Sequence, residues 1–187
     1  MNLEAIAERY VAKEHKDRHG DKLKTHSYIP TYSRILRRHR QKCRLLEVGV
    51  AAGLSLRMWQ EWMPGSLICG LDCSDKWFTE DLKNQFQIAV GHSNVPSARA
   101  KVQRFSESYD VIIDDGDHNP SIQVGTFHNL FPILAPGGTY VIEDIPSIDA
   151  WKHEYVMLGE QYGANVEIVD LRSVKGRSDD VLAIYTR

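Results

Sequence analysis

The sequence contains few cysteines and no long apolar run. Its 187 residues include three cysteines, a number too small and odd for the disulfide framework of a small secreted domain. Cys69 and Cys73 would lie about 13 Å apart along an extended strand, which is too far for a disulfide bond. No segment approaches the roughly 20 apolar residues of a membrane-spanning helix, and the first residues lack the apolar centre of a secretion signal. These absences predict a cytoplasmic protein with no membrane partner.

An excess of positive charge is also missing. The sequence has 23 Lys and Arg against 25 Asp and Glu, a formal net charge of -2. Because proteins that bind nucleic acids usually carry a basic face, we expect no nucleic-acid partner. A hydrophobic content of 42% and a charged content of 26% are typical of a globular protein. The length favours one domain that spans residues 1–187.

From residue 44 onward, short apolar runs alternate with helical patterns. The runs that predict strands are 45–50, 66–73, 86–90, 109–114, 138–144, 164–171 and 180–187. The segments that predict helices are 54–62, 76–84, 94–104, 120–135 and 147–161. Such alternation favours a mostly parallel sheet covered by helices on both faces, a Rossmann-like α/β fold. The last two runs are too close for a parallel crossover, so we expect them to form an antiparallel hairpin at the C-terminus.

The first 42 residues have a different pattern. Leu3, Ile6 and Tyr10 recur at helical spacing behind Asn2, a residue that can cap a helix. The polar stretch 13–25 predicts a loop, and 28–41 predicts a second helix. We interpret residues 1–42 as a helical segment that covers the functional site.

A glycine-rich turn follows the first predicted strand. The strand contains Glu47, and Gly49 and Gly53 separate it from the next helix. Glycines let a backbone approach a ligand closely, although the same spacing also suits a plain strand-to-helix turn. Asp72 ends the second strand, where a carboxylate can accept hydrogen bonds from a ribose diol. The pattern E-x-G-x-x-x-G differs from the G-x-G-x-x-G of dinucleotide binders, which weakens an NAD-dependent oxidoreductase as an alternative.

This turn, Asp72 and the terminal hairpin together resemble class I methyltransferases that use S-adenosylmethionine (SAM). The resemblance covers roughly residues 40–187. It implies that Gly49 and Gly53 flank the methionine part of SAM, that Glu47 lies near its amino group, and that Asp72 binds its ribose. The remaining residues that we assign to the SAM site follow the third strand or end the fourth, and they are Gly91, His92, Ser93 and Asp114. His92 departs from the acidic or amide residue of many relatives, and Asp114 can alternatively cap backbone amides.

Acidic side chains gather after the fourth and fifth strands. The fourth ends in Asp114-Asp115-Gly116-Asp117-His118 and the fifth in Glu143-Asp144. Neighbouring parallel strands would bring these carboxylates to one edge of the sheet. Converging carboxylates repel one another unless they are protonated, paired or bridged by a cation. Since neither cluster contains Lys or Arg, the pattern favours a hard divalent cation such as Mg²⁺.

The motif D-D-G-x-H, followed by L-F-P-x-L-x-P-G-G-x-Y-x-I-E-D, resembles metal-dependent sugar O-methyltransferases that modify macrolide deoxysugars and glycans. His26-Ser27-Tyr28 with Tyr32, and the helix start 55–59, also resemble that group. The resemblance implies that Asp115, Glu143 and Asp144 bind Mg²⁺ or Mn²⁺ and that His118 is the general base. Of two adjacent strand residues only one can face the ion, and Asp117 fits a helix cap better than a ligand.

We therefore expect a SAM-dependent O-methyltransferase that acts on a hydroxyl of a sugar or glycosylated small molecule. One alternative is a metal-independent or catechol-like O-methyltransferase with a phenolic acceptor, because an acid after the fourth strand also occurs in metal-free enzymes. Another is a SAM-binding subunit without activity. His118 can alternatively position the substrate rather than accept its proton. The acceptor and the oligomeric state stay open, and a homo-oligomer is one candidate.

Overall fold

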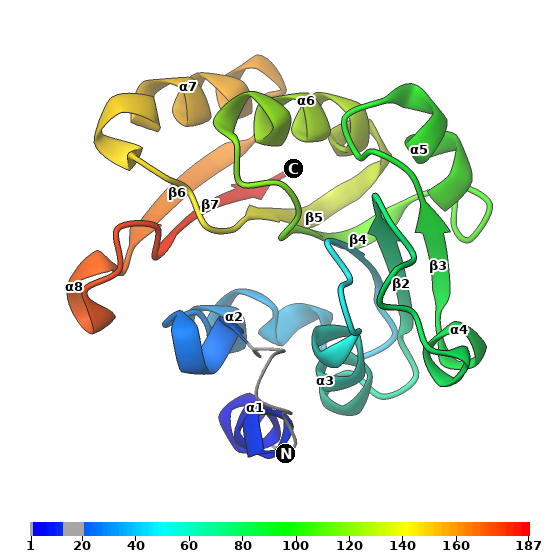
Figure 1. Ribbon diagram of the computed structural model, residues 1–187. Coiled ribbons are helices and arrows are strands. Elements are labelled where there is room, and N and C mark those ends of the chain that lie inside the picture. The colour runs from blue at the N-terminus through cyan, green and yellow to red at the C-terminus, as the bar shows by residue number, and fades with distance from the viewer. Residues whose placement is uncertain (1, 13–20) are drawn as a thin grey trace.

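The computed structural model describes residues 2–12 and 21–187. Seven strands in this part of the chain form one sheet (Figure 1). Their order across the sheet is β3-β2-β1-β4-β5-β7-β6. Strands β1 to β5 run parallel, whereas β7 is antiparallel to both β5 and β6. The strands are β1 (Arg44–Val48), β2 (Leu67–Asp72), β3 (Gln87–Val90), β4 (Tyr109–Asp114), β5 (Leu134–Ile142), β6 (Asn165–Asp170) and β7 (Val181–Thr186). The predicted Rossmann-like fold with a C-terminal antiparallel hairpin is confirmed.

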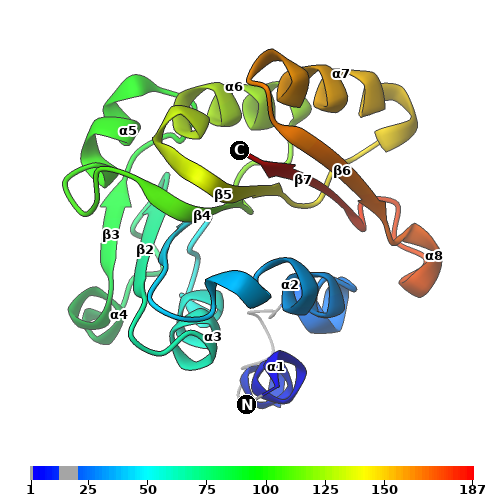
Figure 2. The same cartoon turned by 180° about the vertical axis from the view of Figure 1, so that it is seen from behind.

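Helices cover both faces of this sheet (Figures 1 and 2). One face carries α5 (Pro96–Val102), α6 (Pro120–Leu130) and α7 (Ile148–Gln161). The other carries α1 (Leu3–Ala12), α2 (Ile29–Ile35), α3 (Leu54–Trp62) and α4 (Glu80–Gln85). Short helical turns complete the described chain: η1 (Asp21–Thr25), η2 (Arg37–His39), η3 (Phe131–Ile133) and α8 (Arg172–Lys175). Among these helices, none is long and apolar enough to cross a membrane.

Local sequence signals explain where several helices begin. Thr79 precedes α4, and its hydroxyl accepts a hydrogen bond from the Leu82 amide at 3.2 Å. Asn119 caps α6 by accepting from the Ser121 amide at 3.0 Å. Pro120 then occupies the first position of α6, where its missing N–H costs nothing. The loop after β4 therefore turns sharply into α6.

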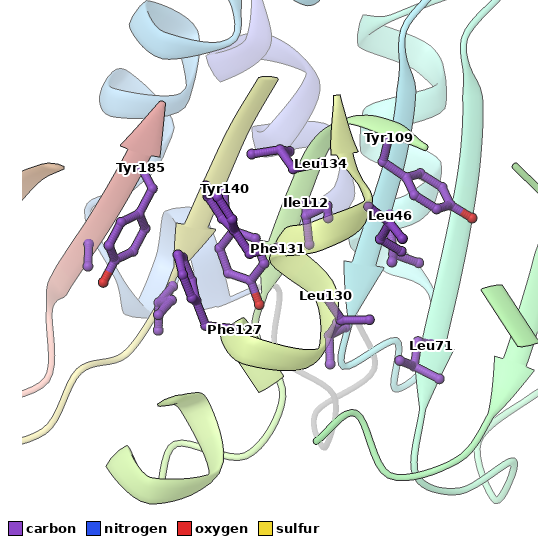
Figure 3. Close-up of a cluster of buried hydrophobic side chains, with 14 of the residues drawn as sticks. Leu46, Leu71, Tyr109, Ile112, Phe127, Leu130, Phe131, Leu134, Tyr140 and Tyr185 are labelled. Atoms are coloured by element: carbon purple, nitrogen blue, oxygen red, sulfur yellow. The ribbon is translucent and has the colours of Figure 1, made fainter. Parts of the chain in front are cut away.

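Alternation along the strands divides the core into two layers. Leu46 and Ile112 face α5, α6 and α7, whereas Leu45 and Val111 face the N-terminal helices. Figure 3 shows the first layer, in which Phe127 of α6 packs among strand residues and other aromatic rings. Because both faces of the central strands are buried, their sequences are continuous apolar runs.

The N-terminal segment differs in part from the prediction. Helix α1 and α2 lie in the two segments for which helices were expected. Residues 13–20 of the predicted loop lie outside the described residues, but Asp21–Thr25 forms the helical turn η1 rather than a loop. Contacts to distant parts of the chain hold this turn, since the Lys175 Nζ donates to the carbonyl of Lys24 at 3.3 Å. The local sequence pattern at 21–25 does not reveal such a distant contact, so it did not predict the turn.

The C-terminal hairpin contains a short helix that was not predicted. Helix α8 occupies four residues between β6 and β7, where we expected only a loop. Gly176 ends it with a φ of 72°, in the left-handed region. The strands still pair as an antiparallel hairpin because four helical residues turn the chain without crossing the sheet.

Candidate active site

The sequence-predicted site residues meet at one edge of the sheet, because β1 to β5 all end there. Backbone hydrogen bonds continue past the strand ends and join the first loop residues. Gly49 donates to Leu71 at 2.9 Å, Asp115 to Val48 at 2.9 Å and Glu143 to Asp114 at 2.9 Å. The predicted residues that follow different strands are therefore neighbours in space.

The glycine turn after β1 has an unusual backbone. Gly49, Ala51 and Gly53 all have positive φ, at 85°, 46° and 73°. A Cβ on Gly49 would lie 1.9 Å from the backbone oxygen of Asp115, so no other residue fits without a shift of that loop. The turn thus brings the main chain after β1 against the main chain after β4. This close approach is what a small-molecule site at the strand ends requires.

Asp72 holds the glycine turn in place. Its Oδ2 accepts hydrogen bonds from the amides of Val50 at 2.8 Å and Ala51 at 3.0 Å. Its Oδ1 accepts from the Ser74 amide at 3.0 Å. The carboxylate therefore joins the end of β2 to the loop after β1. Its predicted contact with a ribose stays a prediction.

The predicted residues after β3 have different surroundings. The amide of Gly91 donates to the carbonyl of Asp72 at 2.8 Å, so Gly91 lies beside the end of β2. The His92 side chain is exposed. The hydroxyl of Ser93 is 2.7 Å from that of Thr126 on α6 and is hydrogen-bonded to it. Their assignment to the SAM site stays a prediction.

Asp114 and Asp115 are adjacent but occupy different environments. Asp114 is buried, and burial raises its pKa to about 8, although the Gly116 amide acts in the opposite direction. Burial and, after it, the Asp114 carboxyl raise the pKa of Tyr140 in β5 and of Tyr155 in α7. Asp115 instead joins the acidic cluster described next. A carboxyl group that is mostly protonated near neutral pH is a poor cation ligand, so Asp115 is the better candidate.

A lysine from the N-terminal segment lies among the carboxylates. The Nζ of Lys22 is 2.6 Å from Asp115 Oδ2, 2.8 Å from both carboxylate oxygens of Glu143 and 3.3 Å from Glu47 Oε1. The Lys22 side chain is 4% exposed, and Glu47 is completely buried. Neither acidic cluster contains Lys or Arg, but the structure pairs these acids with a lysine from elsewhere in the chain. The paired lysine is 93 residues away from Asp115 in the chain.

Two tyrosines from the same segment bind the acids that follow β5. Tyr28 donates its hydroxyl proton to Asp144 Oδ1 at 2.5 Å and accepts from the Asp144 amide at 3.2 Å. Tyr32 donates to Glu143 Oε1. Burial and the neighbouring carboxylates raise the pKa of both tyrosines, so both hydroxyls stay protonated and act as donors. Asp144 has a φ of 53°, and the two bonds to Tyr28 hold it in that strained conformation.

A buried histidine lies beside the same carboxylate. His26 stacks on Tyr28 with ring centroids 4.8 Å apart. Its Nδ1 is 3.3 Å from Asp144 Oδ1 and 3.4 Å from Asp180 Oδ1. The motif His26-Ser27-Tyr28 with Tyr32 was visible in the sequence as part of the resemblance. Lys22 carried no such signal.

Three side chains at the strand ends fit the geometry of a metal site. Asp115, His118 and Asp144 each offer one ligand atom, and these atoms lie within 4.8 Å of one another. The Nε2 of His118 is 3.6 Å from Asp144 Oδ2, and its side chain is 46% exposed. Glu143, the remaining predicted ligand, is paired with Lys22 and Tyr32 instead. Asp117 accepts from the Asn119 amide at 2.9 Å, so it supports the turn before α6 while Asn119 is the actual cap.

The fold defines a class of protein, the Rossmann-like α/β domains, in which ligands generally bind where the parallel strands end. Comparison with known proteins is more specific. A family model described as "Methyltransferase domain" matches residues 46–145. The chain belongs to this methyltransferase family, as the sequence predicted.

Curated relatives of this chain are named as O-methyltransferases. Demethylmacrocin O-methyltransferase of Streptomyces fradiae is 37% identical over 128 residues, which cover 64% of this chain and 32% of the relative. Mycinamicin VI 2''-O-methyltransferase of Micromonospora griseorubida has the same identity and coverage. The chain therefore spans about a third of the length of these relatives.

Solved structures share the fold. The MycE methyltransferase from the mycinamycin biosynthetic pathway, in complex with Mg and SAH, has a TM-score of 0.69 and 23% identity, covering 99% of this chain and 54% of that chain. A putative caffeoyl-CoA O-methyltransferase from Staphylococcus aureus has a TM-score of 0.64 and 17% identity, covering 100% of this chain and 92% of that chain. At these identities the likeness establishes the fold alone.

Proposed function

We propose that this protein transfers a methyl group from SAM to a hydroxyl of a sugar or glycosylated small molecule, with the help of a divalent cation. The observation that carries the proposal is the group Asp115, His118 and Asp144 beside the glycine turn. The names of the curated relatives, which include a 2''-O-methyltransferase of mycinamicin VI, support a glycosylated acceptor. A solved structure of the same fold, described with Mg and SAH, supports the cofactor and the metal.

The chain's own residues suit SAM at the strand ends. When bound, SAM supplies an electrophilic methyl group on a sulfonium. Glu47, Gly49 and Gly53 would surround its methionine part, and the missing side chain at Gly49 lets the main chain after β4 pack against the turn. Asp72 would bind the ribose, Gly91, His92 and Ser93 would lie on the adenine side, and Asp114 is also assigned to the SAM site. Asp72 already holds the turn, so its rigidity supports a preformed site.

The acids fit a divalent cation by their chemistry. Glu47, Asp115, Glu143 and Asp144 are four carboxylates, and Lys22 is within 3.3 Å of three of them. Carboxylate oxygens are hard ligands of the kind that Mg²⁺ and Mn²⁺ prefer. Asp115, Glu143 and Asp144 would hold the ion. When bound, such an ion lowers the pKa of a coordinated hydroxyl and orients it.

His118 suits the role of general base. Its side chain is partly exposed, so an acceptor can reach it, and Nε2 lies 3.6 Å from Asp144 Oδ2. Asp144 would stabilise the positive charge that His118 gains when it takes the proton from the acceptor hydroxyl. Transfer then needs the hydroxyl oxygen about 3 Å from the methyl carbon and in line with the bond that breaks.

A transfer assay with SAM labelled in its methyl group tests the proposal. The purified protein is incubated with demethylated macrolide glycosides, with and without EDTA, and labelled product is measured. We expect product that disappears with EDTA and returns when Mg²⁺ is added in excess. Binding of SAH without transfer to any glycoside would favour a SAM-binding subunit without activity.

Lys22 favours a second candidate, a metal-independent O-methyltransferase with a phenolic acceptor. A lysine ammonium already lies where a cation would be needed, 2.6 Å from Asp115 and 2.8 Å from Glu143. The same assay with catechols and simple phenols separates the candidates. Transfer that EDTA leaves unchanged would reject the metal-dependent mechanism and support this one.

A further inference from the structure

The contacts of Lys22 overlap the predicted metal site. Two of the three predicted ligands, Asp115 and Glu143, accept hydrogen bonds from its ammonium. The third, Asp144, belongs to the group with Asp115 and His118. An ion bound by all three predicted ligands would have to use oxygens that now face Lys22. An ammonium and a divalent ion repel each other at contact distance, so both cannot use the same oxygens.

We propose that Lys22 is a displaceable cation: it neutralises Asp115 and Glu143 until a divalent metal ion takes its place, and it thereby sets the affinity of the site for metal. This inference rests on the proposed metal-dependent function. It assigns to Lys22 a role in selecting the cation that occupies the acidic cluster. Lys22 is not a catalytic residue in this scheme.

The surroundings of Lys22 allow such an exchange without unfolding the segment. Its backbone carbonyl accepts from the Tyr28 amide at 3.1 Å, and Lys175 donates to the carbonyl of His26 at 2.7 Å. These bonds hold η1 by its main chain and do not involve the Lys22 ammonium. The four-carbon stem of a lysine is flexible, so the ammonium can leave while η1 stays in place.

A place for the displaced ammonium is also present. Lys22 Nζ lies 3.3 Å from Glu47 Oε1, and Glu47 is not one of the predicted metal ligands. The other oxygen of Glu47 accepts from the Ser55 hydroxyl at 2.7 Å, which fixes the carboxylate. A shift of the ammonium toward Glu47 would keep it paired in a buried environment, where an unpaired charge is costly.

Metal binding in the absence of SAM tests this inference. Binding of Mn²⁺ is measured by electron paramagnetic resonance and calorimetry for the wild type, Lys22→Met and Lys24→Met. Lys24 is exposed on the same turn and is the matched control for the loss of one positive charge. We expect Lys22→Met to bind Mn²⁺ about tenfold tighter or more, because a competing buried charge is removed. Lys24→Met should stay within about twofold of the wild type, since solvent screens exposed charges.

A crystal structure of the wild type with Mn²⁺ provides a second readout that does not depend on the folding of a variant. Anomalous scattering locates the ion, and we expect Lys22 Nζ to have left Asp115 and Glu143. A bound ion with both Lys22 contacts intact, or equal affinity of the wild type and Lys22→Met, would overturn the inference while the metal site stands. Absence of Mn²⁺ binding in both proteins would overturn the metal-dependent function and the inference together.

Discussion

At the scale of single residues, position along a strand decides what a carboxyl group can do. Asp114 is the last residue of β4 and lies in a buried environment that raises its pKa to about 8. Asp115 follows it and lies 2.6 Å from the Lys22 ammonium. Successive residues of an extended chain face opposite sides, so two adjacent aspartates lie in different environments. Of these two aspartates, Asp115 is the one that belongs to the candidate metal group with His118 and Asp144.

His118 leads to a prediction at this scale. We expect His118→Ala to lower kcat for methyl transfer by about 100-fold or more, because general bases contribute roughly that much. Affinity for SAH, measured by calorimetry, should change little, since His118 contacts Asp144 rather than the glycine turn. His128→Ala is the control, because His128 is an exposed residue of α6 whose Nδ1 contacts only Tyr162 among the hydrogen bonds described. Equal losses of turnover and SAH affinity would contradict the assigned role.

At the scale of elements, the turn between β1 and α3 shapes the site. Its positive φ angles at Gly49, Ala51 and Gly53 fold the chain back after a short strand. The amides of Val50 and Ala51 are then free of the strand ladder and donate to Asp72. The turn, the end of β2 and the loop after β4 therefore form one rigid unit.

Gly49 gives the prediction at this scale. Gly49→Ala should lower the free energy of unfolding by about 4 kcal/mol or more, because its Cβ would overlap the Asp115 backbone. Gly137→Ala is the matched control, since Gly137 also has a positive φ, of 72°, but no atom within 4 Å of its Cβ position. The control should lose about 1 kcal/mol from backbone strain alone. Urea unfolding measures both, and equal losses would show that the close approach to Asp115 is unimportant.

At the scale of the whole molecule, the N-terminal segment completes the site that the sheet begins. Lys22, Tyr28 and Tyr32 contact acids that lie more than 90 positions later in the chain. Helices α1 and α2 pack in the core layer on the face opposite to α6 and α7 (Figure 2). The acids at the strand ends are thus contacted by side chains of the N-terminal segment.

The stability of the whole molecule toward acid depends on a pair that joins its central strands. Asp110 of β4 accepts from the Arg44 amide at 2.8 Å and from its guanidinium at 2.7 Å. These hydrogen bonds with Arg44 lower the pKa of Asp110 below its ordinary 3.8. A depressed pKa means that the folded state favours the charged form. The stabilisation is therefore fully present above the ordinary pKa and is lost as the pH falls through the folded value.

We expect Asp110→Asn to lower the free energy of unfolding by about 1 kcal/mol at neutral pH, a value reduced by the partial exposure of both side chains. The difference from the wild type should be constant from about pH 5 to 8 and should shrink below about pH 4. Urea unfolding at several pH values measures it. Glu80→Gln, which removes an exposed pair with Lys83, is the control and should cost less than about 0.5 kcal/mol. A difference that grows toward acid would contradict the assignment.

Much of the fold could be predicted because its signals are local. The apolar run at 45–50 overlaps β1 and the run at 109–114 coincides with β4, since strands buried on both faces need continuous apolar residues. The short spacing between β6 and β7 predicted their antiparallel pairing. The helical turn at Asp21–Thr25 was missed because distant contacts hold it, and α8 was missed because four residues leave no periodic pattern.

The sequence by itself determined the order of strands and helices, the glycine turn and the positions of the acids, because each depends on residues within a few positions of one another. It also placed Asp115, His118, Glu143 and Asp144 at one edge, since parallel strands end together. Only the tertiary structure decided that Lys22 lies among those acids and that Asp114 faces the buried side. These outcomes depend on which side chains meet across 93 to 121 positions of the chain, and no local pattern encodes such meetings.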